Sequence, residues 1–314
     1  MISLENVAMK LNGAQNIVIT AHTNPDGDAI GSSLAMKHAL ESVGKRAKVV
    51  IDDKLPRHLS CLPDFDTIIR PPQTAEKIPC DIFLVLDTAP DRIGDTQKSF
   101  EGEMLNIDHH ITNKGNPSCT YVDAKRAATA EIIYELLDIM QITLTKKIAS
   151  CLYLGMATDT GFFKFANTTA FTMNAVANCL EAGVKPNEIA EFTEQKSYET
   201  VKTMAEAMNT LELFADGRAA GIFLNEELTK KAETTEGFID QIRIIEGVDI
   251  AVLLKCNNAR ECRVSMRSKG ANVAKIAESF GGGGHIRAAG ATLNMGFYEA
   301  KSAIMAAITF ALKG

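Results

Sequence analysis

The chain has 314 residues, of which 46% are hydrophobic and 23% charged, proportions typical of a globular protein with a sizeable core. The net charge of −6 at pH 7 lies in residues 1–196, where 25 acidic side chains outnumber 19 basic ones. Binding to long duplex nucleic acid requires a broad basic surface. The composition therefore argues against a protein that grips long duplexes.

The sequence gives little indication of a leader peptide, a membrane-spanning segment or a disulfide framework. The first residues have no basic region before an apolar stretch, and apolar runs such as 82–86 are far too short to span a bilayer. Seven cysteines lie between Cys61 and Cys262, and they form no CxxC pair. This odd, scattered set predicts no disulfide framework and indicates a cytoplasmic protein.

The first half of the chain predicts alternating strands and helices. A β-rich run at 16–21 precedes a helix over 28–43, and a second strand is expected over 47–51. Continuous apolar runs over 81–86 and 104–107 are typical of strands buried on both faces of a parallel sheet. Further helices are expected over 129–140, 145–157, 168–182 and 186–192.

The second half has a different pattern. We place a linker at 194–197, which separates a domain at 1–193 from one at 198–314. A hairpin turn is expected at 214–219. Strands are expected over 249–255, 261–267 and 291–293, and helices over 198–212, 238–245, 273–279 and 298–312.

Histidine and aspartate side chains gather where the predicted elements of the first half end. They are His22, Asp26, Asp28, Asp87, Asp108, His109, His110 and Asp159. Open α/β sheets place ligand sites at the carboxyl edge, so we expect these groups to converge. Imidazoles and carboxylates without paired thiolates suit two adjacent Mn²⁺ or Mg²⁺ ions better than a structural zinc. Such a metal pair is suited to attack on a phosphate ester, which favours a small phosphorylated substrate.

Each of these residues also has a structural alternative. Asp26 and Asp28 are common turn and N-cap residues. Asp87 could pair with Arg92 or with a helix N-terminus instead of a cation. Asp159 could simply end a helix, although a carboxylate there opposes the helix dipole.

The paired histidines are the most specific of these signals. Consecutive imidazoles after a strand point in different directions, so both serve one site only with different roles. His109 suits a metal ligand, and His110 suits a contact with the substrate or the leaving group.

Two signals in the second half suggest anion binding. Arg263 and Arg267 share one strand face, while Val264 and Met266 share the other. Paired guanidinium groups suit phosphate or carboxylate, although a solvent-facing edge would show the same pattern. The glycine run at 281–284 would let the backbone approach a ligand closely, although flexible linkers have the same composition.

At these residues the chain resembles the DHH phosphoesterase family, and within it the two-domain bacterial nano-RNases, also known as oligoribonuclease and phosphoadenosine-phosphate phosphatase enzymes. The first domain matches through His22-Thr23-Asn24-Pro25-Asp26-Gly27-Asp28-Ala29-Ile30-Gly31-Ser32, Asp87, Asp108-His109-His110 and Asp159-Thr160-Gly161. The second resembles the DHHA1 substrate domain through Ser265-Met266-Arg267-Ser268 and the segment 281–290. One departure is Lys164, where relatives often have Arg; lysine keeps the charge but lacks the forked guanidinium that binds phosphate through two hydrogen bonds.

The resemblance implies an α/β fold and a set of site residues. The fold would have an N-terminal, mostly parallel sheet flanked by helices, a smaller C-terminal α/β domain, and an active site in the cleft between them. Two Mn²⁺ ions, with Mg²⁺ as the alternative, would bind to His22, Asp26, Asp28, Asp87, His109 and Asp159, with Asp87 bridging. The catalytic residues would be Asp87, Asp108 and His110, with Asp108 orienting an imidazole. Substrate contacts would come from His110, Arg267, Ser268, Gly283, Gly284 and His285.

The activity implied is that of a Mn²⁺-dependent phosphodiesterase and phosphatase. It would degrade very short oligoribonucleotides to 5′-mononucleotides and convert 3′-phosphoadenosine 5′-phosphate to AMP. The alternatives are a phosphodiesterase for linear or cyclic dinucleotides such as pApA and pGpG, a pyrophosphatase, and a nucleotide sensor without catalysis. The expected partners are these small substrates, with no long duplex and no membrane, and a homodimer is left open.

Overall fold

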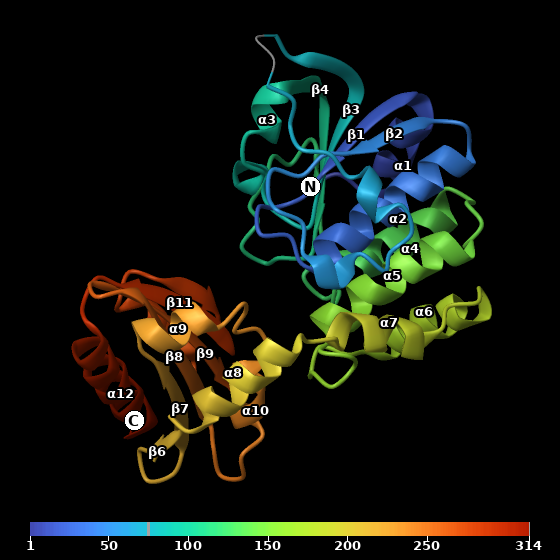
Figure 1. Ribbon diagram of the computed structural model, residues 1–314. Helices are drawn as coiled ribbons and strands as arrows, with labels where there is room; N and C mark the ends of the chain where they lie inside the picture. The colour runs from blue at the N-terminus through green and yellow to red at the C-terminus, as the bar shows by residue number, and fades with distance from the viewer. Residues whose placement is uncertain (74–75, 314) are drawn as a thin grey trace. The chain divides into compact units, whose positions relative to one another are not determined.

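The computed structural model describes residues 1–73 and 76–313, and its chain divides into two compact units, Met1–Gln195 and Lys196–Gly314 (Figure 1). Each unit has its own sheet and its own hydrophobic core. The predicted α/β class is confirmed, with a five-stranded parallel sheet in the first unit and a six-stranded mixed sheet in the second. Within the described residues, no helix combines the length and apolar character needed to span a membrane.

The sheet of the first unit has the strand order β2-β1-β3-β4-β5, and every neighbouring pair is parallel. The strands are β1 (Asn16–Thr20), β2 (Arg46–Val49), β3 (Ile78–Leu86), β4 (Phe100–Asp108) and β5 (Thr120–Val122). The last five residues of β3 are all buried, as expected for a strand covered on both faces. Because the strands are parallel, their carboxyl ends meet at one edge of the sheet.

Three helices, α2, α4 and α5, pack together beside the sheet of the first unit (Figure 1). The helices of this unit are α1 (Leu4–Gly13), α2 (Gly27–Ser42), α3 (Thr96–Ser99), α4 (Thr129–Ile139), α5 (Lys146–Asp159), α6 (Ala170–Glu181) and α7 (Pro186–Glu194). Gly155 of α5 allows the close approach, since a Cβ atom there would lie 2.8 Å from both Ala130 Cβ and Asp28 Oδ1. This packing places the start of α2 beside the end of α5.

Some boundaries in the first unit differ from the predictions. Helix α1 was not predicted; its N-cap Ser3 accepts a hydrogen bond from the Asn6 amide at 3.2 Å. Helix α5 continues through Asp159 instead of ending at Ala157, because its last residues keep helical hydrogen bonding. Asp159 therefore belongs to the last helical turn rather than to the loop after it.

The sheet of the second unit has the order β10-β11-β9-β8-β7-β6, and only the pair β7–β8 is parallel among its described strands. The strands are β6 (Glu212–Phe214), β7 (Ala219–Leu224), β8 (Ile250–Asn258), β9 (Glu261–Ser268), β10 (Gly283–His285) and β11 (Ala288–Leu293). The helices are α8 (Tyr198–Met208), α9 (Glu226–Lys231), α10 (Phe238–Arg243), α11 (Val273–Glu278) and α12 (Phe297–Lys313). The predicted hairpin turn at 214–219 does join two antiparallel strands.

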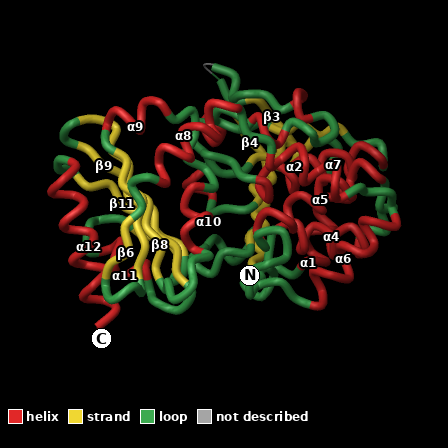
Figure 2. Tube along the Cα trace, turned by 60° about the horizontal axis from the view of Figure 1, so that its bottom comes forward, coloured by secondary structure: helices red, strands yellow, loops and turns green. Residues whose placement is uncertain are grey.

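Helices cover the two faces of this second sheet unequally (Figure 2). On one face, α11 and α12 pack against alternate residues of β8, β9 and β11. On the other face, the apolar cluster contains residues of α8, α10, β7 and β8, but none of β9 or β11 among the described residues. The β9–β11 half of this face therefore carries no apolar cover of its own.

The second unit contains a strand that was not predicted and a disulfide that contradicts the prediction. Gly283 and Gly284 pair with Gly290 and Ala289 in the β10–β11 hairpin, so half of the glycine run forms strand. The expectation of no disulfide framework is wrong to the extent that Cys256 and Cys262 are bonded. These two cysteines are register partners on the antiparallel strands β8 and β9, which places their side chains together.

Candidate metal centre

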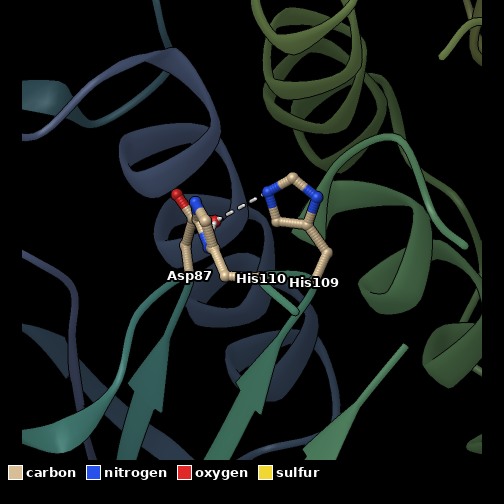
Figure 3. A group of neighbouring side chains, drawn as sticks. All are labelled: Asp87, His109 and His110. Atoms are coloured by element: carbon tan, nitrogen blue, oxygen red, sulfur yellow. Dashed lines mark ion pairs between the residues drawn. The ribbon is translucent and has the colours of Figure 1, made fainter. Parts of the chain in front are cut away.

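The predicted His and Asp side chains converge at the carboxyl edge of the parallel sheet. His22 follows β1. Asp87 follows β3, and His109 and His110 follow β4 (Figure 3). The end of α5 brings Asp159 to the same place, because its carboxylate lies 3.3 Å from the His109 ring. Residues far apart in the sequence thus form one cluster.

The described residues contain three groups whose potential ligand atoms all lie within 4.8 Å of one another. The groups are His22 with Asp26 and Asp87, Asp28 with His109 and Asp159, and Asp87 with His109 and His110. Asp87 and His109 each belong to two groups. This overlap is the arrangement that two neighbouring cations sharing a bridging ligand would need.

His22 directs one ring nitrogen into the cluster. Its Nδ1 lies 2.9 Å from the Thr23 carbonyl oxygen, so Nδ1 carries the hydrogen and donates it. Its Nε2 lies 3.5 Å from Asp87 Oδ2 and 3.8 Å from Asp26 Oδ1. Such a second hydrogen bond is what orients a histidine for metal binding.

His109 provides the most direct test of whether these residues fit a cation. Its Nε2 is buried and makes no hydrogen bond within the described residues, although it lies 3.3 Å from Asp159 Oδ2 and 3.5 Å from Asp87 Oδ1. Its Nδ1 lies 3.3 Å from the Arg126 carbonyl oxygen. A buried nitrogen without a hydrogen bond between two carboxylates is costly unless a cation joins the three groups. The donor set therefore fits a divalent metal.

Asp28 has a structural contact as well as a place in the cluster. The side chain is fully buried, and it accepts hydrogen bonds from the amides of Thr129 at 2.6 Å and Ala130 at 2.9 Å. These amides begin α4, so the carboxylate faces the positive end of that helix dipole. Asp26 caps α2 by accepting from the amides of Asp28 and Ala29. The capping alternative for these aspartates is thus observed together with their place in the cluster.

Asp87 lies at the centre of the cluster in an unusual backbone conformation. Its φ is 60°, a left-handed value that non-glycine residues rarely adopt, and its side chain is only 2% exposed. The Thr129 hydroxyl donates to Asp87 Oδ1 at 2.9 Å. The alternative pairing with Arg92 is not among the ion pairs of the described chain. Strain of this kind is typical of functional sites.

Burial and the repulsion between neighbouring charges shift the pKa values of the carboxylates in the cluster. Burial, followed by the charges of neighbouring aspartates, raises the pKa of Asp87 and of Asp159 well above the usual range. Burial also raises the pKa of Asp28. Burial would lower the pKa of His22, but the contacts with Asp26 and Asp87 outweigh it and raise this pKa to about 10. Without metal, the cluster holds protons that a bound cation would displace.

A second network holds His110. Its Nδ1 lies 2.7 Å from Asp108 Oδ1, and Asn113 donates to Asp108 Oδ2 at 2.8 Å. The hydrogen bond to Asp108 raises the pKa of the His110 imidazole, against the effect of burial. Asp108 therefore fixes the ring and favours its positive form, which suits contact with a phosphate oxygen.

The predicted substrate residues of the second unit differ in accessibility. Arg267 is half-buried, and burial lowers the pKa of its guanidinium. Ser268 is 3% exposed and its hydroxyl donates to the Ala271 carbonyl, so a substrate contact would have to replace that bond. Gly283 and Gly284 lie in β10, and the side chain of His285 lies outside the described part of the structure.

Three supporting residues had no predicted role, although Ser32 lies in the first matched motif. Thr129 binds both Asp28 and Asp87, Asn113 holds Asp108, and Ser32 donates to Asp28 at 3.0 Å. The role of Ser32 could have been predicted, because it lies four residues after Asp28 on a predicted helix. Thr129 and Asn113 have no comparable signal, since their partners depend on the tertiary fold.

Comparisons with known proteins agree with this arrangement. A profile described as the DHH family, N-terminal domain, matches residues 16–156, and a DHHA1 domain profile matches 219–313. A Thermus thermophilus protein named bifunctional oligoribonuclease and PAP phosphatase NrnA is 38% identical over 280 residues, which cover 88% of this chain and 84% of that protein. The chain belongs to the DHH/DHHA1 phosphoesterase family.

Two further proteins are similar to this chain at lower identity but over most of its length. A Bacillus subtilis protein with the same name is 27% identical over 285 residues, covering 88% of this chain and 89% of that protein. A solved Bacteroides fragilis structure, described as an exopolyphosphatase-related protein, has a TM-score of 0.89 and 26% identity, covering 99% of this chain and 97% of that one. Both DHH/DHHA1 units of this chain are therefore represented in its relatives.

Proposed function

We propose that this chain is a divalent-metal phosphohydrolase that degrades very short oligoribonucleotides to 5′-mononucleotides and dephosphorylates 3′-phosphoadenosine 5′-phosphate to AMP. The observation that carries the proposal is His109 Nε2, buried without a hydrogen bond between the carboxylates of Asp87 and Asp159. A protein that only binds nucleotides has no need of such a donor set. The 38% identity to a protein named oligoribonuclease and PAP phosphatase supports the choice of substrates.

The proposed metal ligands fall into two sets that share Asp87. His22, Asp26 and Asp87 would hold one ion, while Asp28, Asp87, His109 and Asp159 would hold the other. The mixture of imidazole and carboxylate favours Mn²⁺ and also permits Mg²⁺. Two such ions stabilise the attacking and leaving oxygens of a phosphate ester.

The protein's own groups position the substrate. Asp108 holds the His110 ring through Nδ1, so the imidazole carries its positive charge to a higher pH than usual and can contact a phosphate oxygen. Residues 1–193 form the catalytic domain in this proposal, 194–197 the linker, and 198–314 the substrate domain. Arg267, Ser268, Gly283, Gly284 and His285 of that domain would contact the nucleotide.

The direct test is to incubate the full chain with Mn²⁺ and separate the products. The substrates are 3′-phosphoadenosine 5′-phosphate, pApA, pGpG, pyrophosphate and RNA of increasing length. We expect mononucleotides from the short RNAs and AMP from the bisphosphate. Cleavage of pyrophosphate alone would support a pyrophosphatase, and binding without any product would support a sensor.

Two variants connect the activity to the proposed residues. Asp87→Ala is expected to lose turnover on every substrate while the far-ultraviolet circular dichroism stays unchanged, because both ions lose a ligand. Arg267→Ala is expected to raise KM for dinucleotides with little effect on a small chromogenic phosphodiester. Near-normal turnover in Asp87→Ala would exclude the two-metal arrangement, and equal losses on both substrates in Arg267→Ala would exclude nucleotide selection by this arginine.

A further inference from the structure

The β9–β11 half of the second sheet, which lacks apolar cover from the described residues on one face, contains a groove of about 460 Å³ on that face. It lies over β8, β9 and β11, where Lys255, Arg263, Ser265, Gly290 and Thr292 line it. Register places Lys255 opposite Arg263 and Thr292 beside Arg263, so these side chains share one face. The opposite face of the same strands packs against α11 and α12.

The charge of this groove is one-sided. None of its described lining residues is acidic, and neither Lys255 nor Arg263 makes an ion pair within the described chain. Lys255 donates to the Thr235 hydroxyl at 3.1 Å, and the Arg263 guanidinium is exposed. Burial and the nearby Arg263 charge lower the pKa of the Lys255 ammonium. Two adjacent cations without a counter-charge favour an anion in the groove.

The shape of the groove suits an extended ligand. Gly281, Gly282 and Gly290 contribute backbone without side chains, so a ligand can approach the peptide groups closely. Arg263 and Arg267 lie on the same strand face four residues apart, about 13 Å at the rise of a β-strand. This separation is longer than one phosphate group, so the two arginines would contact different phosphates of one chain.

We propose that Lys255 and Arg263 form a subsite for a phosphodiester group of single-stranded RNA beyond the group being hydrolysed, so that the second unit favours longer members of the substrate range. This inference rests on the proposed function for its choice of ligand. It assigns a role to two residues outside the motifs that identify the family. Charge complementarity selects the occupant, because a polyanion matches a cationic groove without acidic lining residues.

The test compares RNA of two and of five nucleotides on the double variant Lys255→Gln/Arg263→Gln of the full chain with Mn²⁺. We expect kcat/KM for the five-nucleotide RNA to fall about tenfold or more, and the dinucleotide value to stay within about twofold. The slope of log(kcat/KM) against log[salt] for the longer RNA should decrease in magnitude by about 0.7, the contribution of the one single-strand phosphate contact that the double variant loses. Arg260→Ala is the matched control, because it removes an exposed cation from the β8–β9 turn outside the groove.

Dinucleotide turnover in the double variant reports whether it is folded, and Lys255→Arg should retain the preference because it keeps the charge. Equal losses on both RNAs, or no loss on the longer one, would overturn the subsite. Binding of a labelled five-nucleotide RNA in the presence of EDTA separates this inference from the proposed function. Wild-type binding in EDTA that is lost in the double variant, together with no turnover by either protein when Mn²⁺ is supplied, would refute the activity and keep the subsite. No binding by the wild type would refute the subsite.

Discussion

Replacing Gly155 by alanine should damage the metal centre through packing alone. The new Cβ would lie 2.8 Å from Ala130 Cβ and from Asp28 Oδ1, whereas carbon contacts prefer about 3.5–4.0 Å. Helices α2, α4 and α5 meet at this point, so about 0.7 Å or more of displacement must be absorbed by Asp28 or by the helices. Overpacking of this kind costs about 1–3 kcal/mol.

The gain in helix propensity from glycine to alanine, about 1 kcal/mol, offsets part of this cost. We therefore expect Gly155→Ala to lower the free energy of unfolding by up to about 2 kcal/mol. Since Asp28 is a proposed metal ligand, the affinity for Mn²⁺ should fall about 10–100-fold, as it does when supporting residues of metal sites are altered. Urea unfolding in EDTA measures the first effect, and calorimetric titration with Mn²⁺ measures the second.

Gly13→Ala is the matched control. Gly13 ends α1, and a Cβ atom there meets nothing within 4 Å, so this change should stabilise the protein by about 0.4–1 kcal/mol and leave Mn²⁺ affinity unchanged. If Gly155→Ala behaved like Gly13→Ala in both measurements, the reasoning from close helix packing to ligand position would be refuted.

Three further predictions concern protons and charge. In EDTA, the pKa values of Asp87 and Asp159 are raised, so the native state binds more protons than the unfolded state at pH values above 3.8. The free energy of unfolding should therefore fall as the pH rises above that value. Urea midpoints that do not change with pH, or that depend on pH equally in the wild type and in Asp87→Asn, would contradict this. Mn²⁺ binding should release protons at pH 7, since the pKa of His22 is about 10 without metal, and calorimetry in buffers of different ionisation enthalpy should reveal this release as buffer-dependent heats. Asp108→Asn should lower the pKa of His110 and move any basic limb of the pH–rate profile to lower pH, whereas an unmoved limb would show that His110 does not set it.

Much of the first unit could be predicted because its signals are local. The apolar runs of β3 and β4 end at Asp87 and Asp108, and parallel strands bring such ends to one edge. The two contacts of Thr129 could not be predicted, since Asp28 lies 101 residues away and meets it only after α2 and α4 pack. Local sequence patterns therefore indicate the aspartates at the strand ends, whereas the contacts that support them depend on tertiary packing.

Parts of the second unit were harder to predict, because their residues show no periodic pattern of apolar and polar side chains. A run of glycines has no alternation of apolar and polar residues, so Gly283 and Gly284 gave no strand signal, and only pairing with β11 defines them as β10. The bond between Cys256 and Cys262 depends on the register of β8 and β9, which spacing along the chain does not reveal.

The left-handed backbone of Asp87 has a consequence for engineering this protein. Asparagine or glycine adopts a φ of 60° more readily than aspartate, and neither adds a negative charge to the crowded cluster. A redesign that selected only for thermostability would therefore tend to remove this carboxylate. Consensus or stability-guided libraries of the chain should keep position 87 fixed, because the residue that gives the highest stability there is expected to differ from the residue that activity requires.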